Sequence, residues 1–324
     1  MRRVLVPLDL PPVVRMAVPG DALVHELRGE TMGTAWSVKL VAPPRHPLHP
    51  VRERIQRALD LVVAQMSTWI AESDISRFNR AAAGTWCELP AEFREVLKYS
   101  LAVSEETGGA FDPAAGAMVD LWGFGPAGAR NGLPGADEII AARRKPKFKL
   151  ASGRRALQPG GVKLDLSGVA KGFAVDLVSE QLGRLGLNDH LIEIGGELRG
   201  SGVKPDGSPW WVALEGPAET VVALHGLSVA TSGDSRRYFE VGGRRFSHTI
   251  DPRSGYPVPP SVESVTVLHR RCMCADALAT ALTVLGVSAG LGHAEQHGLA
   301  ARFIIRGPDS PQEHATSAFA AMLN

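Results

Sequence analysis

The segment SHTIDPRSGYP, residues 247–257, places a histidine, an aspartate and an arginine close together between prolines and a glycine. A histidine titrates near neutral pH and therefore suits the role of a general base. Asp-Pro and Ser-Gly pairs are also ordinary turn signals. The pattern leaves two interpretations of His248: a polar residue of a tight turn, or a base held by a rigid loop.

A second candidate site is the pair Asp276 and Thr280 in the segment ADALATALTVLG. Residues four apart lie on one face of a helix, one turn apart. A carboxylate and a hydroxyl are oxygen ligands of the kind that Mg²⁺ prefers, with waters or substrate phosphates at its other positions. The alternative is that Asp276 caps the start of the helix and Thr280 packs through its methyl group.

Glycine-containing pairs at 167–168, 171–172 and 195–196 follow expected strands. Ser167-Gly168 and Lys171-Gly172 lie where a helix should begin, and backbone amides at such a place can receive phosphate oxygens. Glycine serves a turn and a close backbone approach equally well. Both interpretations stay open for these pairs.

Aromatic residues gather among glycines in TGGAFDPAAGAMVDLWGFG, residues 107–125. Phe111, Trp122 and Phe124 could hold a planar ring system beside Asp112. Aromatic side chains more often belong to the core, so core packing is the alternative.

The elements that would position these residues mix helices with pairs of strands. Apolar spacing predicts helices at 51–69, 90–109, 169–186 and 274–286, strands at 31–42, 160–166, 190–202, 210–216, 262–270 and 299–307, and a loop at 125–136. The helices do not alternate strictly with single strands. The sequence therefore predicts an α+β fold of antiparallel sheets with flanking helices.

Composition excludes several classes of protein. The 324 residues hold 35 Lys and Arg against 34 Asp and Glu, which does not indicate a nucleic-acid-binding face. No stretch reaches the roughly 18 apolar residues of a membrane span. Three cysteines argue against a disulfide framework. We expect Cys272 and Cys274 to act as small apolar residues on one buried face of a strand rather than as metal ligands.

The first twenty residues, MRRVLVPLDLPPVVRMAVPG, begin with two arginines as an export signal would. Asp9 and three prolines then interrupt the apolar run, and neither a cleavage site nor a cysteine for a lipid anchor follows. The expectation is a cytoplasmic protein. The alternative, for a misannotated or trimmed N-terminus, is a periplasmic, membrane-anchored protein.

Seven segments together resemble the ApbE family, the FAD:protein FMN transferases. In order they are ETMGT, MSTWIAESDISRFN, GGAFDPAAGAMVDLWGFG, LDLSGVAKGFAVD, IGGELRGSG, VATSGDSRRYFEVGGRRFSHTIDPRSGYPV and SVTVLHRRCMCADALATAL. The resemblance runs from about residue 30 to about residue 307. It implies an ApbE-like (T-fold-like) single catalytic unit at 30–324 after an N-terminal extension at 1–29.

The family resemblance implies Mg²⁺-dependent transfer of FMN from FAD to a Ser or Thr hydroxyl of an acceptor flavoprotein, with release of AMP. FAD would be the substrate, Mg²⁺ the cofactor, and the acceptor protein the partner. Two alternatives remain: a pyrophosphatase that cuts FAD to FMN and AMP, and a non-catalytic FAD-binding protein.

The same resemblance assigns roles to individual residues. The magnesium ligands would be the Ala170 carbonyl, the Asp276 carboxylate and the Thr280 hydroxyl, and His248 would be the base. Trp69 and Phe173 stand where relatives often have tyrosine, so the aromatic face persists without the phenolic hydrogen bond. The implied nucleotide contacts are Met32, Trp69, Ala110, Phe111, Asp112, Ser167, Phe173, Ile250 and Ala279.

Overall fold

The computed structural model of the protein describes residues 3–8, 20–143, 146, 150–151, 153–233 and 238–323. The prediction that no export signal is present rests on residues 1–20, and most of these lie outside the described residues.

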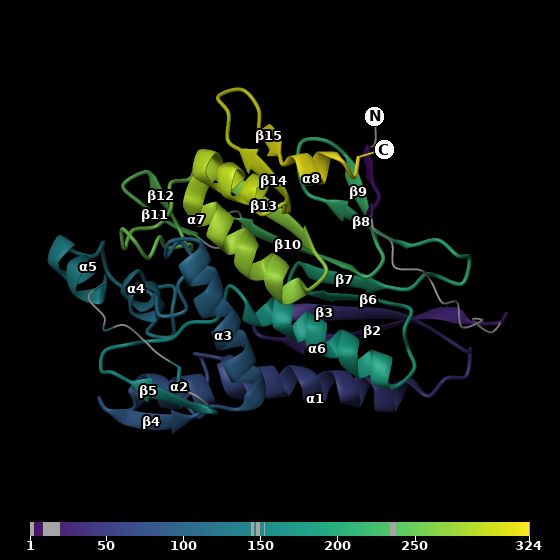
Figure 1. Ribbon diagram of the computed structural model, residues 1–324, viewed down its shortest axis with the longest axis horizontal. Helices are drawn as coiled ribbons and strands as arrows, with labels where there is room; N and C mark the ends of the chain where they lie inside the picture. The colour runs from purple at the N-terminus through teal and green to yellow at the C-terminus, as the bar shows by residue number, and fades with distance from the viewer. Residues whose placement is uncertain are drawn as a thin grey trace.

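An eight-stranded sheet forms the centre of the molecule (Figure 1). Every neighbouring pair in it is antiparallel. This confirms the predicted α+β class with antiparallel sheets. In spatial order the strands are β15 (Gln312–Ala315), β14 (Ala300–Ile305), β13 (Val262–His269), β10 (Leu227–Gly233), β7 (Glu197–Ser201), β6 (His190–Ile194), β3 (Thr34–Ala42) and β2 (Leu23–Thr31).

Three helices cover one face of this sheet: α1 (Leu48–Met66), α6 (Ala170–Arg184) and α7 (Cys272–Gln296) (Figure 1). Their apolar stripes meet the inward-facing strand residues in the main core. In α1 the spacing of Ile55 and Leu59 places both side chains on the buried face, as the three-to-four periodicity predicts.

A smaller sheet and a short helix cover the opposite face. The smaller sheet has the order β1 (Arg3–Leu5), β9 (Thr220–Leu224) and β8 (Trp210–Leu214), and α8 (Ser317–Ala320) lies beside it. Their apolar residues form a second core with the large sheet. Because β1 and β2 belong to these sheets, parts of residues 1–29 are integral to the fold.

The remaining elements lie beyond the end of the large sheet, at the left of Figure 1. They carry the loops that surround the candidate site. They are α2 (Asp74–Arg80), α3 (Ala91–Glu106), α4 (Gly116–Leu121), α5 (Ala136–Arg143), and the hairpins β4 (Thr85–Glu88) with β5 (Arg155–Gln158) and β11 (Tyr238–Val241) with β12 (Arg244–Ser247).

Helix α7 consists of two halves joined at Gly286, whose φ of 75° and ψ of −177° are not helical. We call residues 272–285 the proximal half and residues 287–296 the distal half. Among the described residues α7 is the one helix long and apolar enough to cross a membrane, but 67% of its apolar window is buried within the protein. Its packing against β10, β13 and α6 identifies it as the central core helix.

The predicted helices at 51–69, 90–109 and 169–186 match α1, α3 and α6. The strand predicted at 160–166 is wrong, because that segment forms only an isolated bridge between Lys163 and Ala115. The strand expected at Cys272 and Cys274 is also wrong, since Cys272 begins α7. Both thiols are nevertheless buried, as predicted.

Candidate active site

Asp276 and Thr280 lie one turn apart on the proximal half of α7, as their spacing predicts. Asp276 is buried, and its Oδ2 accepts a hydrogen bond from the amide of Gly172 on α6 at 2.9 Å. A side chain at Gly172 would collide with the backbone of Cys272 and the Cβ of Asp276. Glycine there lets the first turn of α6, which begins at Ala170, approach α7 closely.

The alternative that Asp276 caps α7 is wrong, because the helix starts four residues earlier, after Arg271. Asp176 of α6 does the capping instead. Its two carboxylate oxygens accept hydrogen bonds from the amides of Cys272 and Met273 at 3.0 Å each. A carboxylate at the N-terminus of a helix satisfies amides that have no partner within the helix and interacts favourably with the helix dipole. Because Asp176 is the cap, the Asp276 carboxylate is available for another role.

Two further charged groups stand beside Asp276, a buried glutamate and a partly exposed lysine. Lys171 forms an ion pair with Glu197 of β7. Burial raises the pKa of Glu197 to about 7, the charge of Asp276 acts in the same direction, and Lys171 opposes both. Burial likewise raises the pKa of Asp276, while Lys171 and the Gly172 amide act to lower it. The site therefore holds two carboxylates and one lysine, and a cation bound there would favour the ionised form of both carboxylates.

Gly168, in the turn before α6, lies close to Thr280 on the proximal half of α7. A Cβ on Gly168 would lie 3.1 Å from the Thr280 hydroxyl oxygen and 3.3 Å from the Phe111 ring. The absent side chain leaves that hydroxyl accessible from the turn. The structure thus brings together Thr280, Phe111 and the 167–168 turn, which are far apart in the sequence.

The turn before α6 offers fewer open amides than the sequence suggested. The amide of Ser167 donates to Asp165 Oδ1 at 2.8 Å, the amide of Ala170 donates to the Leu166 carbonyl at 2.8 Å, and the amide of Gly172 donates to Asp276. Of the two interpretations left open for Lys171-Gly172, close backbone approach is therefore the one observed, because the Gly172 amide is occupied by Asp276. Gly195 and Gly196 form the turn between β6 and β7, as the turn interpretation predicts.

The segment 247–257 is a rigid loop built on a tight turn, so both initial interpretations describe part of it. The amide of Gly255 donates to the Asp251 carbonyl at 2.7 Å, and the amide of Asp251 donates to the Tyr256 carbonyl at 2.8 Å. Asp251 also pairs with Arg253 of the same loop at 2.9 Å. Gly255 has a φ of 79°, a conformation that favours glycine. This bonding fixes the backbone beside His248.

Of the aromatic residues in the 107–125 segment, Trp122 and Phe124 pack in a cluster that supports this loop, whereas Phe111 lies in the main core. Trp122 stacks on Phe246 with ring centroids 5.7 Å apart, and its indole nitrogen donates to the Gly255 carbonyl at 2.8 Å. Phe124 meets the His248 ring edge-on at 6.2 Å. Ile250 is buried in the same cluster. The aromatic cluster therefore orients both the loop and the histidine.

The loop also contacts α7. Arg253 donates to the Val284 carbonyl at 3.3 Å, and Val258, Ala110 and Val284 form a small buried cluster. Val284 is one helical turn beyond Thr280. The histidine loop and the Asp276–Thr280 pair are thus attached to the same half of one helix.

The other residues assigned to the nucleotide lie in different surroundings. Phe111, Phe173 and Ala279 are buried in the main core, and Asp112 accepts a hydrogen bond from the Ala114 amide. Met32 has a φ of 51° in the turn between β2 and β3. Trp69, in contrast, is 59% exposed in the turn after α1.

A cleft lies between the segment after α1 and the segment before α6. Its lining includes Thr68, next to Trp69, and Asp165, which binds the Ser167 amide. Lys163 pairs with Asp120 at 2.9 Å along the same cleft. Thr68 and Asp165 therefore border one hollow although the sequence separates them widely, while Trp69 and Ser167 themselves are not among the residues that line it.

Sequence reasoning did not assign a role to Glu197 or Asp176. Glu197 directly follows the glycine pair at 195–196, and this position after a turn is the sequence feature that could have marked it as a candidate site residue. Asp176 lies one turn after Gly172 on the α6 face that meets α7. Its capping role needs the position of α7, which the sequence does not supply.

Comparison with known proteins gives consistent matches over nearly the whole chain. The family model described as "ApbE family" matches residues 32–303. The chain is 38% identical to the FAD:protein FMN transferase of Haemophilus influenzae, covering 92% of this chain and 91% of that protein, and 36% identical to that of Vibrio cholerae, covering 93% of each. The apo crystal structure of Pseudomonas stutzeri flavinyl transferase ApbE superposes with a TM-score of 0.87 at 39% identity, covering 93% and 97% of the two chains.

Proposed function

This chain belongs to the ApbE family and is a transferase, and we propose that it moves FMN from FAD to a Ser or Thr hydroxyl of an acceptor protein in a Mg²⁺-dependent reaction that releases AMP. The observation that carries the proposal is the buried Asp276 carboxylate, one turn from the Thr280 hydroxyl and held against the first turn of α6. The similarity to transferases of this name over more than nine-tenths of the chain supports the same reaction.

The donor set fits Mg²⁺. A carboxylate from Asp276, a hydroxyl from Thr280 and the carbonyl of Ala170 are all oxygen ligands, and the ion commonly keeps waters or phosphates at its other positions. When bound, Mg²⁺ would neutralise charge on the pyrophosphate of FAD. Lys171 and the Gly172 amide stabilise the ionised form of Asp276.

In the proposed reaction His248 takes the proton from the acceptor hydroxyl. The hydroxyl oxygen forms a new bond to the phosphorus on the FMN side of the pyrophosphate, and the bond from that phosphorus to the bridging oxygen breaks. AMP leaves with the bridging oxygen. The loop hydrogen bonds and the Phe124 contact hold the imidazole in place. Such positioning accounts for much of the catalysis in phosphoryl transfer.

The first test combines the purified protein, FAD, Mg²⁺ and an acceptor domain with a flavinylation-type Ser or Thr. Intact-protein mass spectrometry should show a mass gain of one FMN less water, and a chelator should abolish the gain. Conversion of FAD to FMN and AMP without a mass gain would favour the pyrophosphatase. FAD that binds but stays unchanged, with every acceptor tried, would favour the non-catalytic binding protein.

The role of His248 is tested with His248→Ala. Loss of a general base should slow transfer by about 10²- to 10⁴-fold. FAD affinity should stay near that of the wild type, because the loop is held by Asp251, Gly255 and Trp122. His314→Ala, at an exposed histidine of β15, serves as the matched control and should transfer normally. Unchanged transfer by His248→Ala would remove this histidine from the mechanism.

A further inference from the structure

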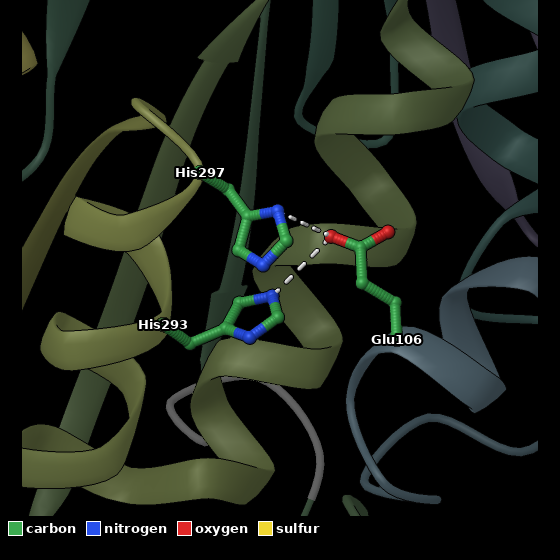
Figure 2. Close-up of side chains that lie close together, drawn as sticks. All are labelled: Glu106, His293 and His297. Carbon is green, nitrogen blue, oxygen red and sulfur yellow. Dashed lines mark ion pairs between the residues drawn. The ribbon is translucent and has the colours of Figure 1, made fainter.

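A second group of potential metal ligands lies at the far end of α7. It consists of Glu106, the last residue of α3, His293 in the distal half of α7, and His297 directly after that helix. Figure 2 shows the two imidazole rings stacked on each other with the carboxylate pointing at both. The ring centroids are 4.4 Å apart.

The distances between these atoms suit one shared ion. Glu106 Oε1 lies 3.5 Å from His293 Nε2 and 3.2 Å from His297 Nδ1 (Figure 2). The three ligand atoms all lie within 4.8 Å of one another. Two ligands of a tetrahedral ion with bonds of about 2.0–2.1 Å are separated by about 3.3 Å, so only small side-chain movements are needed to admit the ion.

His293 Nε2 is buried and makes no well-formed hydrogen bond. Its side chain is 11% exposed, and Glu106 Oε1, at 3.5 Å from Nε2, lies at the outer limit of hydrogen-bond distance. A buried polar atom without a partner is costly, and native proteins rarely keep one without a reason. Coordination of Nε2 would remove this cost.

We propose that Glu106, His293 and His297 bind a divalent first-row metal ion, with Zn²⁺ as the best fit. Two imidazoles and one carboxylate are a ligand set that zinc accepts, and water can occupy a fourth position. Imidazole favours zinc, copper or nickel over Mg²⁺. Glu106 and His297 are 38% and 36% exposed, so the ion and its water can enter from the surface.

This site is separate from the one proposed to hold Mg²⁺. His293 lies seventeen positions after Asp276 in the chain. In a straight helix that would correspond to about 25 Å, and the kink at Gly286 changes the direction of the distal half. The inference does not depend on the proposed function.

The bound ion would act as a clamp between α3 and the distal half of α7. Glu106 is four residues before Ala110, which packs against Val284 at the end of the proximal half. Fixing both Glu106 and the distal half therefore restrains the short connection 107–109 and the segment that follows it. We expect the ion to stabilise the folded protein, since it binds the native arrangement and not the unfolded chain.

The test uses the full chain, stripped with a chelator and then given excess Mg²⁺ to fill the catalytic site. Zinc affinity is measured by competition with a chromogenic zinc chelator, and stoichiometry by native mass spectrometry. One zinc ion per chain should bind at micromolar or lower free zinc and raise Tm. His297→Ala and Glu106→Gln, both at partly exposed positions, should each weaken zinc binding by at least about tenfold.

Two controls separate this site from other binding. His49→Ala removes an exposed histidine that faces a single carboxylate, Glu53, and should leave zinc affinity unchanged. Asp276→Ala should also retain the zinc ion. The proposal is overturned if the wild type binds no zinc at micromolar concentration, if His297→Ala and Glu106→Gln bind it as the wild type does, or if Asp276→Ala alone abolishes binding.

Discussion

The two halves of α7 present different chemistry because they differ in burial. The proximal half carries Asp276 in the protein interior, beside Lys171 and the Gly172 amide. The distal half ends near the surface, where His293 and His297 stack on each other and Glu106 contacts a nitrogen of each ring. The first half offers oxygen ligands among buried charges, and the second offers imidazoles that are partly open to water.

This difference shows how one helix can serve two purposes. A buried carboxylate needs neighbouring cations or amide donors to stay ionised, and α6 supplies both to Asp276. His293 needs no such support, because burial and the neighbouring His297 lower its pKa and so favour the neutral ring that can coordinate a metal ion. The non-helical Gly286 separates the halves, so a change in one need not propagate to the other.

The largest predicted effect comes from Asp276→Ala. We expect Mg²⁺-dependent turnover to fall by at least about 10²- to 10³-fold, because a pre-positioned charge is lost from the reacting centre. Steady-state turnover measured across a range of Mg²⁺ concentrations checks this. Full activity at low Mg²⁺ would contradict the ligand assignment. Normal zinc binding by the same variant would show that the distal half binds its ion independently of Asp276.

Lowering the pH should destabilise the packing of β6 against α6, the helix that contacts the proximal half of α7. His190 of β6 donates from Nδ1 to the Leu187 carbonyl at 2.8 Å, and its Nε2 accepts from the Ser179 hydroxyl of α6 at 2.8 Å. Burial, the main cause, lowers the pKa of His190 to about 4. The unfolded chain, with an ordinary histidine pKa of about 6.5, therefore binds protons first as the pH falls.

It follows that the contribution of His190 to stability is present above pH 6.5 and is lost between about pH 6.5 and pH 4. The difference amounts to about 3 kcal/mol in the free energy of unfolding. Urea denaturation over this pH range, compared between the wild type and His190→Asn, measures it. Equal pH slopes for the two proteins would show that His190 is not the cause.

Asp176→Ala should lower stability by about 2 kcal/mol. The variant loses the cap on the Cys272 and Met273 amides and an ion pair with Arg199 at 3.0 Å. Denaturant titration measures the change, with Glu180→Ala as a matched control at an exposed carboxylate of α6. A loss no larger than the control's would mean that α7 does not depend on this cap.

The smallest effect is predicted for Gly286→Ala, at about 1 kcal/mol of stability, the low end of the usual cost of a strained backbone conformation. The φ of 75° and ψ of −177° belong to a region that only glycine occupies readily, while no atom lies within 4 Å of the added Cβ. Any reorientation of the distal half should weaken zinc binding more than turnover. Gly292→Ala, inside the same half and also uncrowded, is the control. Wild-type stability of Gly286→Ala would argue against a strained kink.

Much of the fold follows from local patterns. The three-to-four spacing in α1 and the four-residue spacing of Asp276 and Thr280 are properties of a single helix, so the sequence alone predicted both. The rigidity of the 247–257 loop could also be predicted from the sequence, because its hydrogen bonds join near neighbours in the chain. The resemblance to the ApbE family was recognisable from seven ordered segments.

Tertiary structure decided what those patterns left open. The sequence could not show that Asp176 rather than another residue caps α7, or that Lys171 pairs with Glu197. Nor could it show that Glu106 meets His293 of α7 and His297 directly after that helix. Each of these contacts joins segments far apart in the chain. Local spacing fixes which residues share a face of one helix, whereas the packing of whole helices and strands determines which faces meet.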